Sequence, residues 1–327
     1  MKKTGSNQRT GREGLGVSAK RTGLGWLSVL MLSVAGCASV SGELHRSIRE
    51  PADVQITGTI QTPALRECSG LARSVCAPDL LWTHNDSGDD PLLYLIDLQG
   101  GLRSTLRVRD AKAKDWEDIA SGEFNGKSWL FVADIGDNKL KRKHVRIYVL
   151  EDPCGVEGGV DRKECPLWYE LRFQYEDGGH NAEALGVDPG SGDLYLVTKT
   201  AMSSCGVYRM PASTWQERPG GMQTARRVAT LPWARVTAMD IAPDGLRALV
   251  MTRTNGYEYE RKAEESWAEA FAGEPDKIIL PHREQGEAVC YGTGRQLILA
   301  SESEQVLSPI WVLDLDEKAD APPAENE

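Results

Sequence analysis

The sequence predicts an all-β fold: a β-propeller of five four-stranded blades closed by an N-terminal strand, with six blades as the alternative. The 327-residue chain contains 33 Gly and 16 Pro, a content typical of many short strands joined by turns. A pattern of three short strands recurs five times, and turn signals such as DPGSGD and APDG join its strands. Its period is close to the roughly 40–50 residues of a propeller blade.

The five copies align on one position near the start of the first strand of each copy. The aligned residues are Ser69, Glu117, Glu183, Met239 and Glu287. The interval of 66 residues between the second and third copies is the longest. It leaves room for a sixth blade, although we attribute its excess length to the loop between Cys154 and Cys165.

A fourth strand follows each of the first four copies, at 102–108, 169–176, 225–231 and 276–281. The fifth copy has none, and the segment 54–61 would supply it. Pairing of this segment with the last copy closes the ring and removes the exposed edges of an open array. The propeller is thus predicted over 53–316, with a short helix or lid at 257–274 and a disordered acidic tail at 317–327.

Residues 1–36 are predicted to be a signal peptide, because a basic stretch precedes a short apolar run. The run ends in VAGC, which resembles the lipobox of bacterial lipoproteins. The resemblance implies cleavage before Cys37, a diacylglyceryl group on its sulfur, and the lipid bilayer as a partner. The alternative is a cleaved signal followed by a stray cysteine. Residues 37–52 would form a flexible tether, and Ala38 in place of Asp favours the outer membrane of a bacterial cell envelope.

The charge of the chain limits its partners. The full chain carries −10, and residues 1–36 hold six basic residues and one acidic residue, so the mature chain would carry −15. Such a surface argues against binding to nucleic acid or to anionic headgroups, and it favours cations or cationic ligands.

Seven cysteines are present. If Cys37 carries the lipid, six remain in an oxidising compartment, where disulfides persist. Cys154 and Cys165 flank a Gly-rich loop and are the expected disulfide pair. Three pairings remain open for the other four, which are Cys68, Cys76, Cys205 and Cys290. Thiol catalysis is not expected, because no His–Cys signature accompanies any of them.

Acidic residues stand at both ends of a predicted hairpin in DWEDIASGEFNGKSWLFVADIGDN, residues 115–138. In a propeller the first strand of each blade begins at the face where the second strand ends, so these residues converge on one mouth of the channel. The expected ligand-binding residues are His84, Asn85, Asp86, Glu117, Glu183, Lys199, Asp240, Arg253, Glu287 and Glu302. The candidate metal ligands are Asp115, Asp118, Asp134, Asp137 and Asn138. Hard oxygen ligands with few His favour Ca²⁺ over zinc or copper.

A simpler interpretation competes with this site. Asp, Asn and Gly are common in turns, so Asx-turns explain NDSGDD and DIGDN equally well. The recurring Glu residues are harder to explain, because a turn requires no Glu. Like charges around a narrow channel repel. Lys199 and Arg253 would balance part of this charge, and a bound cation more. His84 and His180 taken singly are more typical of structural hydrogen bonding.

The motifs GLA, HNDSGD, DWEDIA, DIGDN, AEAL…DLYLVTK and QGEAV resemble an uncharacterised group of bacterial secreted or lipid-anchored propellers. They are more distantly similar to WD40-like, NHL-like and phytase-like propellers. The resemblance covers residues 54–316 and implies a fold and an axial site, but no known reaction. The chain lacks a G-x-S-x-G elbow, a Walker loop, an H-E-x-x-H helix and a C-x-x-C pair.

Two functions of different class follow. The first is a tethered binding propeller that holds a cation or small ligand at its mouth and whose protein partner is unknown. The alternative is a calcium-dependent hydrolase of phosphate esters or glycosides. Its catalytic candidates are Asp118, Glu183, Glu287, Lys199 and Arg253. Lys199 and Arg253 would contact a phosphate, and two of the three acids would serve as acid and base or nucleophile.

Overall fold

The computed structural model describes residues 45–153, 162–302 and 308–316. The chain divides into two compact units, 1–42 and 43–327, and all described residues belong to the second. The predicted signal peptide, the lipidation site Cys37, Cys154 and the acidic tail lie outside the described residues. In the described part of the chain, no helix has the length and apolar character needed to cross a bilayer.

Antiparallel pairing arranges twenty described strands in five groups of four. Group 1 is β3 (Cys68–Arg73), β4 (Leu80–Asn85), β5 (Leu92–Asp97) and β6 (Leu102–Val108). Group 2 is β7 (Trp116–Phe124), β8 (Lys127–Asp134), β9 (Val145–Glu151) and β11 (Tyr169–Tyr175). Group 3 is β12 (Ala182–Val187), β13 (Leu194–Thr198), β14 (Cys205–Met210) and β15 (Gln223–Leu231).

Group 4 is β16 (Val236–Ile241), β17 (Arg247–Thr252), β18 (Asn255–Glu260) and β19 (Asp276–Ile279). Group 5 is β20 (Gln285–Tyr291), β21 (Gln296–Glu302), β22 (Pro309–Asp314) and β2 (Asp53–Thr59). Two short strands add to the outer edges in parallel: β1 (Ser47–Arg49) pairs with β19, and β10 (Arg162–Cys165) pairs with β6. The described helices are α1 (Ser213–Gln216) and α2 (Trp267–Ala272).

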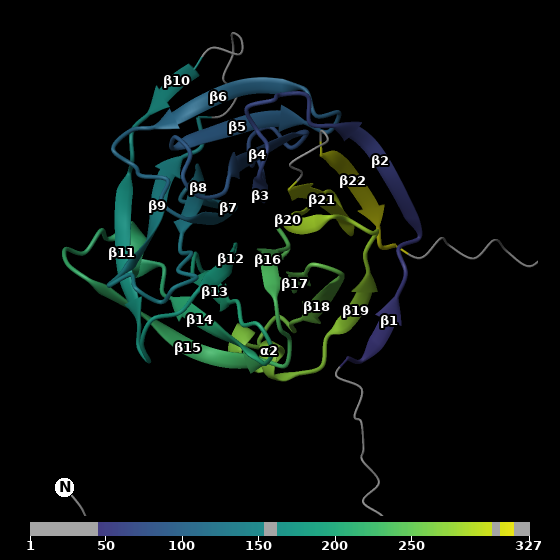
Figure 1. The fold of residues 1–327 in the computed structure, drawn as a ribbon. Coiled ribbons are helices and arrows are strands. Elements are labelled where there is room, and N and C mark those ends of the chain that lie inside the picture. Colours follow the sequence, from purple (N-terminus) through teal and green to yellow (C-terminus); the bar gives the residue numbers. More distant parts are fainter. Residues whose placement is uncertain (1–44, 154–161, 303–307, 317–327) are drawn as a thin grey trace, which may run out of the picture. The chain divides into compact units, whose positions relative to one another are not determined.

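The five groups close into a ring. Their first strands contact one another in the order β3, β7, β12, β16, β20 and back to β3, and they lie innermost around the centre of Figure 1. The N-terminal strand β2 pairs antiparallel with β22, near the C-terminus. The predicted all-β propeller closed by an N-terminal strand is therefore confirmed.

One pairing departs from simple repetition of the four-stranded pattern. The outer strands β11 and β15 pair in parallel, so groups 2 and 3 form one eight-stranded sheet. Because these two groups share a sheet, the number of five blades stays a prediction.

The core lies between neighbouring groups. Each of five hydrophobic clusters joins two successive groups, including one between groups 5 and 1 that contains Leu71 and Ile310. In the cluster of groups 2 and 3, Phe131 and Leu185 are fully buried. Burying a side chain of this size stabilises the fold by about 1.5–3 kcal/mol. The clusters thus fix the innermost strands, which carry the candidate site.

Three local expectations differ from the structure. The helix expected at 257–274 contains the end of β18, and only Trp267–Ala272 is helical. In the expected flexible tether, Ser47–Arg49 form a strand. Cys165 is a free, buried thiol, so the predicted Cys154–Cys165 disulfide is wrong. Cys76 is disulfide-bonded, and the four other cysteines of the described residues are free.

Candidate functional site

A β-bulge near the start of each innermost strand positions the recurring site residue. The register shifts by one residue at the same place in all five strands. The extra residues are Ser69, Glu117, Glu183, Thr237 and Glu287. A bulge re-aims its side chain relative to the ladder. The aligned residue of group 4 is thus Thr237, and the predicted Met239 lies two residues further along β16.

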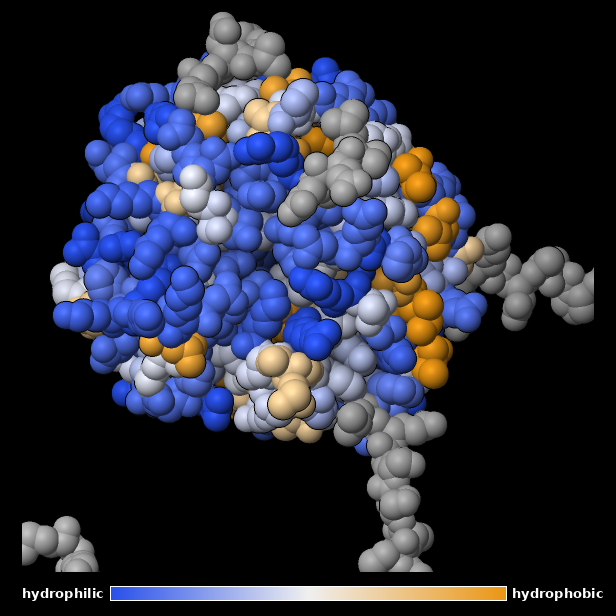
Figure 2. Space-filling view, in the orientation of Figure 1, coloured by the Kyte–Doolittle hydropathy of each residue, from blue (hydrophilic) through white to orange (hydrophobic). Residues whose placement is uncertain are grey.

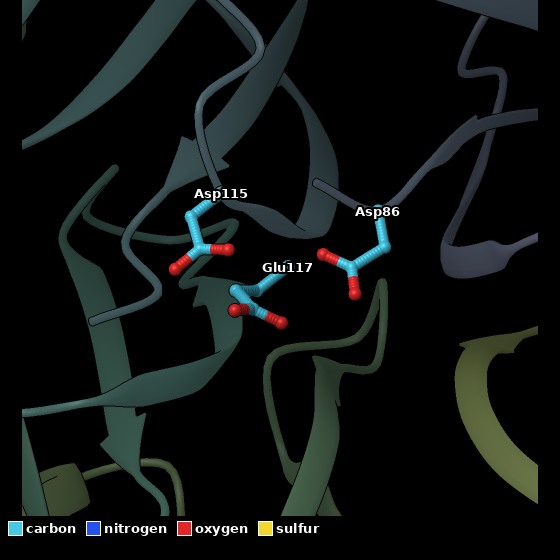
Figure 3. A group of neighbouring side chains, drawn as sticks. All are labelled: Asp86, Asp115 and Glu117. Atoms are coloured by element: carbon cyan, nitrogen blue, oxygen red, sulfur yellow. The ribbon is translucent and has the colours of Figure 1, made fainter. Parts of the chain in front are cut away.

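Three carboxylates from different segments form the acidic group. Asp86 follows β4, Asp115 precedes β7 and Glu117 is the bulge residue of β7. One oxygen of each lies within 4.8 Å of the others, and Figure 3 shows the three side chains directed toward a shared space. No described basic side chain lies within ion-pair distance of any of the three.

The carboxylates of the acidic group are buried and repel one another. Glu117 is only 4% exposed, and burial, with the charges of Glu183, Asp86 and Asp115, raises its pKa well above the usual value. Burial, with Asp115, Glu183 and Glu287, raises the pKa of Asp86 to about 7. The Oδ1 atom of Asp86 is buried without a hydrogen-bond partner among the described residues. These groups favour either a proton or a bound cation.

Glu183 lies beside the acidic group and has a cationic partner. Its Oε2 accepts a hydrogen bond from Lys199 Nζ at 2.8 Å, and its Oε1 accepts one from Asn181 Nδ2 at 2.8 Å. Burial nonetheless raises the pKa of Glu183, and the charge of Lys199 opposes this rise. Lys199 therefore balances one acid of the mouth.

Glu287 and Glu302 form the corresponding part of group 5. Arg253 Nη2 lies 3.5 Å from Glu287 Oε1 and donates to Gln285 Oε1 at 2.9 Å. Gln285 in turn donates to Glu302 Oε2 at 2.9 Å. Burial and the nearby Glu287 raise the pKa of Glu302 to about 9. The mouth thus contains more acids than bases.

A cavity of about 480 Å³ lies on the basic side of this mouth. Its lining includes Lys199 and Arg253, which pair with acids of the site, and also Arg235. The surface visible in Figure 2 is mainly hydrophilic around its centre. A ligand here would meet cationic and anionic groups together.

Two predicted residues bind the backbone of neighbouring strands instead of facing the mouth. Asp118 is fully buried and accepts from Leu185 N at 2.8 Å and from its neighbour Ile119 N at 2.9 Å. Asp240 accepts from Tyr291 N at 2.7 Å, near the other end of the channel. Their carboxylates tie adjacent innermost strands together, so the structure does not bring them to the acidic group.

Three candidate metal ligands are also used elsewhere. Asp134 is fully buried, with Arg142 Nη1 at 2.9 Å and Arg146 Nη1 at 3.3 Å. Asp137 accepts from the backbone N of Lys141 and Arg142, four and five residues further along, and so holds the loop between β8 and β9. Asn138 Oδ1 accepts from Asn181 Nδ2 at 3.3 Å. Of the five predicted metal ligands, only Asp115 belongs to the acidic group.

His84 and Asn85 support the local fold. Asn85 Oδ1 accepts from the backbone N of Arg66 and Glu67. His84 is fully buried against Trp116, and burial lowers its pKa to about 4. His180 contacts Asp177 and Tyr208 rather than the acidic group.

Gly136 is a site residue that the sequence analysis did not single out. A Cβ atom at this position would overlap Glu117 Oε1 and lie 2.6 Å from Asp115 Cγ. The DIGDN motif therefore needs glycine to make room for two carboxylates. The glycine in this motif could have indicated the close approach of the carboxylates, but a turn accounts for a glycine equally well.

No protein-family model matches this chain, and no curated protein matches it. Structures similar to it include the Dos1 propeller (10% identity, TM-score 0.36), of which it covers 61%, with 78% of this chain aligned. The nidogen/laminin complex is 14% identical with a TM-score of 0.41, and 73% of each chain is covered. The mitotic checkpoint complex is 12% identical with a TM-score of 0.37, covering 76% of this chain and 62% of that chain.

Proposed function

We propose that the protein is a lipid-anchored, extracytoplasmic binding propeller that holds a divalent cation at Asp86, Asp115 and Glu117. The observation that carries the cation site is the convergence of three carboxylate oxygens within 4.8 Å of one another. Oxygens that share one Ca²⁺ at about 2.3–2.6 Å must lie within about 5 Å of each other. The anchor rests on the VAGC motif and Cys37.

The balance of charge around the mouth favours a cation as the ligand of this acidic group. Six acids surround the mouth, namely Asp86, Asp115, Glu117, Glu183, Glu287 and Glu302. Of these, the structure pairs Glu183 with Lys199 and Glu287 with Arg253. A divalent cation would relieve the repulsion among the remainder. Elevated pKa values are expected for a cluster of carboxylates whose charges the protein does not balance.

The test compares the melting temperature of the purified full chain in chelator-treated buffer with its melting temperature as Ca²⁺ is added. We expect Ca²⁺ to raise the melting temperature by several degrees, because a ligand that binds only the folded state stabilises it. Asp86→Asn with Glu117→Gln should remove the shift. Asp79→Asn, at an exposed residue, is the matched control and should keep it. No shift at millimolar Ca²⁺ would eliminate the cation site.

The anchor requires its own experiment. Metabolic labelling with palmitate should modify the wild-type chain but not Cys37→Ser, and only the wild type should sediment with the cell envelope. Equal labelling of both chains would disprove lipidation at Cys37 without affecting the cation site.

Hydrolysis of a phosphate ester is a second candidate, favoured by the cavity beside the acids that Lys199, Arg235 and Arg253 line. These side chains suit an anionic substrate group next to a bound cation. Glu183 and Glu287 would supply the acid–base roles, whereas the carboxylate of Asp118 accepts from a backbone amide. Turnover of p-nitrophenyl phosphate that is lost in Lys199→Met and Glu183→Gln would establish this activity. If there is no turnover in the presence of Ca²⁺, hydrolysis is excluded and the binding function remains.

A further inference from the structure

A second cavity lies at the opposite end of the channel. Its volume is about 290 Å³, and its lining includes Arg73, Ile241 and Tyr291. These are the last residues of β3, β16 and β20, whereas the bulge residues lie near the starts of the innermost strands. The two ends of the channel therefore present independent sites.

Arg73 is a fixed guanidinium on the wall of this cavity. Its Nε donates to Pro78 O at 2.7 Å and its Nη1 donates to Gly292 O at 3.1 Å. Within the described ranges, no carboxylate lies at ion-pair distance from it, and its Nη2 takes part in none of the hydrogen bonds. Carbonyl contacts thus orient the cation but leave its charge unpaired.

Asp240 is a carboxylate on the wall of the same cavity. Its Oδ2 accepts from Tyr291 N at 2.7 Å, and its Oδ1 accepts from Ile241 N at 2.8 Å. Each carboxylate oxygen retains a further lone pair. No basic side chain of the described residues pairs with it. Asp240 is therefore oriented by backbone groups, like Arg73, and also lacks a counter-ion.

The side chains of Arg73 and Asp240 bind adjacent backbone residues but do not form an ion pair with each other. Arg73 binds the carbonyl of Gly292, and Asp240 binds the amide of the preceding residue, Tyr291. Two such groups attract strongly where water is limited, so a molecule with one charge of each sign would satisfy both. The rest of the lining is mixed: Val75, Val187, Pro189 and Pro243 are apolar, whereas Ser74, Ser121 and the exposed Glu123 are polar.

We propose that this cavity binds a small zwitterion of the α-amino acid type with an apolar side chain. The ligand carboxylate accepts from Arg73 Nη2, its ammonium group donates to the free lone pairs of Asp240, and its side chain packs against Val187 and Ile241. A volume of about 290 Å³ is near the lower limit of roughly 300 Å³ for small-molecule sites, which excludes large ligands. This site does not depend on the cation site or on the lipid anchor.

The test is isothermal titration of the full chain with three probes of similar shape. L-Leucine carries both charges, 3-methylbutylamine lacks the carboxylate, and 4-methylpentanoate lacks the ammonium group. We expect L-leucine to bind about 10- to 100-fold more tightly than either single-charge probe, the usual effect of one charged hydrogen bond. Addition of a chelator should leave the binding unchanged.

Variants locate the binding. Arg73→Gln and Asp240→Asn should each weaken L-leucine binding by about 10-fold or more, whereas Arg226→Gln, at an exposed arginine that lines neither cavity, should bind normally. If Asp240→Asn fails to fold, Arg73→Gln decides alone, because its side chain is partly exposed. The proposal is overturned if 10 mM L-leucine gives no heat, if the three probes bind equally, or if Arg73→Gln binds like the wild type.

Discussion

Buried carboxylates at the outer edge of group 4 and at the channel mouth have opposite environments. Asp276 on β19 receives hydrogen bonds from Arg46 at 2.6 and 2.9 Å and an ion pair from Arg49 at 2.6 Å. Burial alone would raise its pKa, but the hydrogen bonds from Arg46 and Ser47 outweigh burial and lower it. Glu117 has no such partner among the residues that the structure describes, and its pKa is raised.

The difference separates acids whose charge the fold neutralises from acids whose charge it leaves unbalanced. Near Asp276 the fold supplies Arg49 from β1 and Arg46 from just before it, more than 220 residues away in the chain. At the mouth no described arginine pairs with Asp86, Asp115 or Glu117, although Arg142 lies close by and pairs with Asp134. A fold that leaves some buried acids unbalanced while it neutralises others is typical of a ligand site.

Removal of a paired acid should have the largest effect. Asp276→Ala deprives Arg46 and Arg49 of their shared acceptor and detaches β1 from β19, so we expect a loss of about 3 kcal/mol in the free energy of unfolding. Urea denaturation measures it. The exposed control Asp79→Ala should change stability by less than about 0.5 kcal/mol. A similarly small loss for Asp276→Ala would contradict the structural role of this network.

Crowding the acidic group should come next. Gly136→Ala forces a methyl group against Glu117 and Asp115, and overpacking of this kind costs about 2 kcal/mol. It should also reduce the calcium-dependent shift in melting temperature. Gly179→Ala, where no atom lies within 4 Å of the added Cβ, is the control. Equal stabilities of the two variants would show that Gly136 serves only its turn.

The pH dependence of the calcium-free protein should reveal the unpaired acids. The pKa values of Asp86 and Asp240 are raised to about 7 and that of Glu302 to about 9, so between pH 6.5 and 9 the folded state binds more protons than the unfolded state. Stability must then fall as pH rises through this window. Allowing for partial exposure, we expect a loss of about 2 kcal/mol.

This window isolates the acids from His84, whose pKa of about 4 lies below it. Chemical denaturation at several pH values in chelator measures the slope, and Ca²⁺ should flatten it. If stability instead rises between pH 6.5 and 9, the acids at the mouth are not unbalanced.

The substitution Glu117→Gln should have the smallest effect on stability, and the sign of that effect is informative. Glu117→Gln mimics the protonated side chain, so at pH 8 in chelator it should stabilise the protein by about 1 kcal/mol, and at pH 5 it should be neutral. The same change should weaken the response to Ca²⁺. Thermal denaturation at both pH values tests this, and destabilisation at pH 8 would mean that Glu117 has a structural role.

The sequence predicted the architecture well where the signal is periodic. The four outer strands and the closing strand at 54–61 were found because alternating apolar residues and turn motifs mark strand ends directly. The bulge glutamates were found because they recur. Tyr257 and Tyr259 also alternate with Glu258 and Glu260, and this period of two marks β18, but the many charges in the segment favoured a helix.

The site was harder to predict because strand ends do not reveal side-chain partners. Asp118 is adjacent to Glu117, yet successive strand residues point to opposite sides, and its carboxylate binds the amide of Leu185 in the next group. Asp134 has its charge balanced by Arg142 and Arg146, which only the folded hairpin brings near. In group 4 the bulge residue is Thr237, two residues before the Met239 that the sequence alignment gave, and no Glu marks it in the sequence.

The pairing of β2 with β22 has a consequence for biosynthesis. One sheet joins residues 53–59 to residues 309–314, so the earliest propeller strand made by the ribosome waits for the latest one. Until then β2 has no neighbour within its sheet, and the hydrophobic surfaces of groups 1 and 4 that face group 5 remain uncovered. A nascent chain of this design gains its final stability only after nearly all of it has been translated, which makes chaperone protection during synthesis valuable.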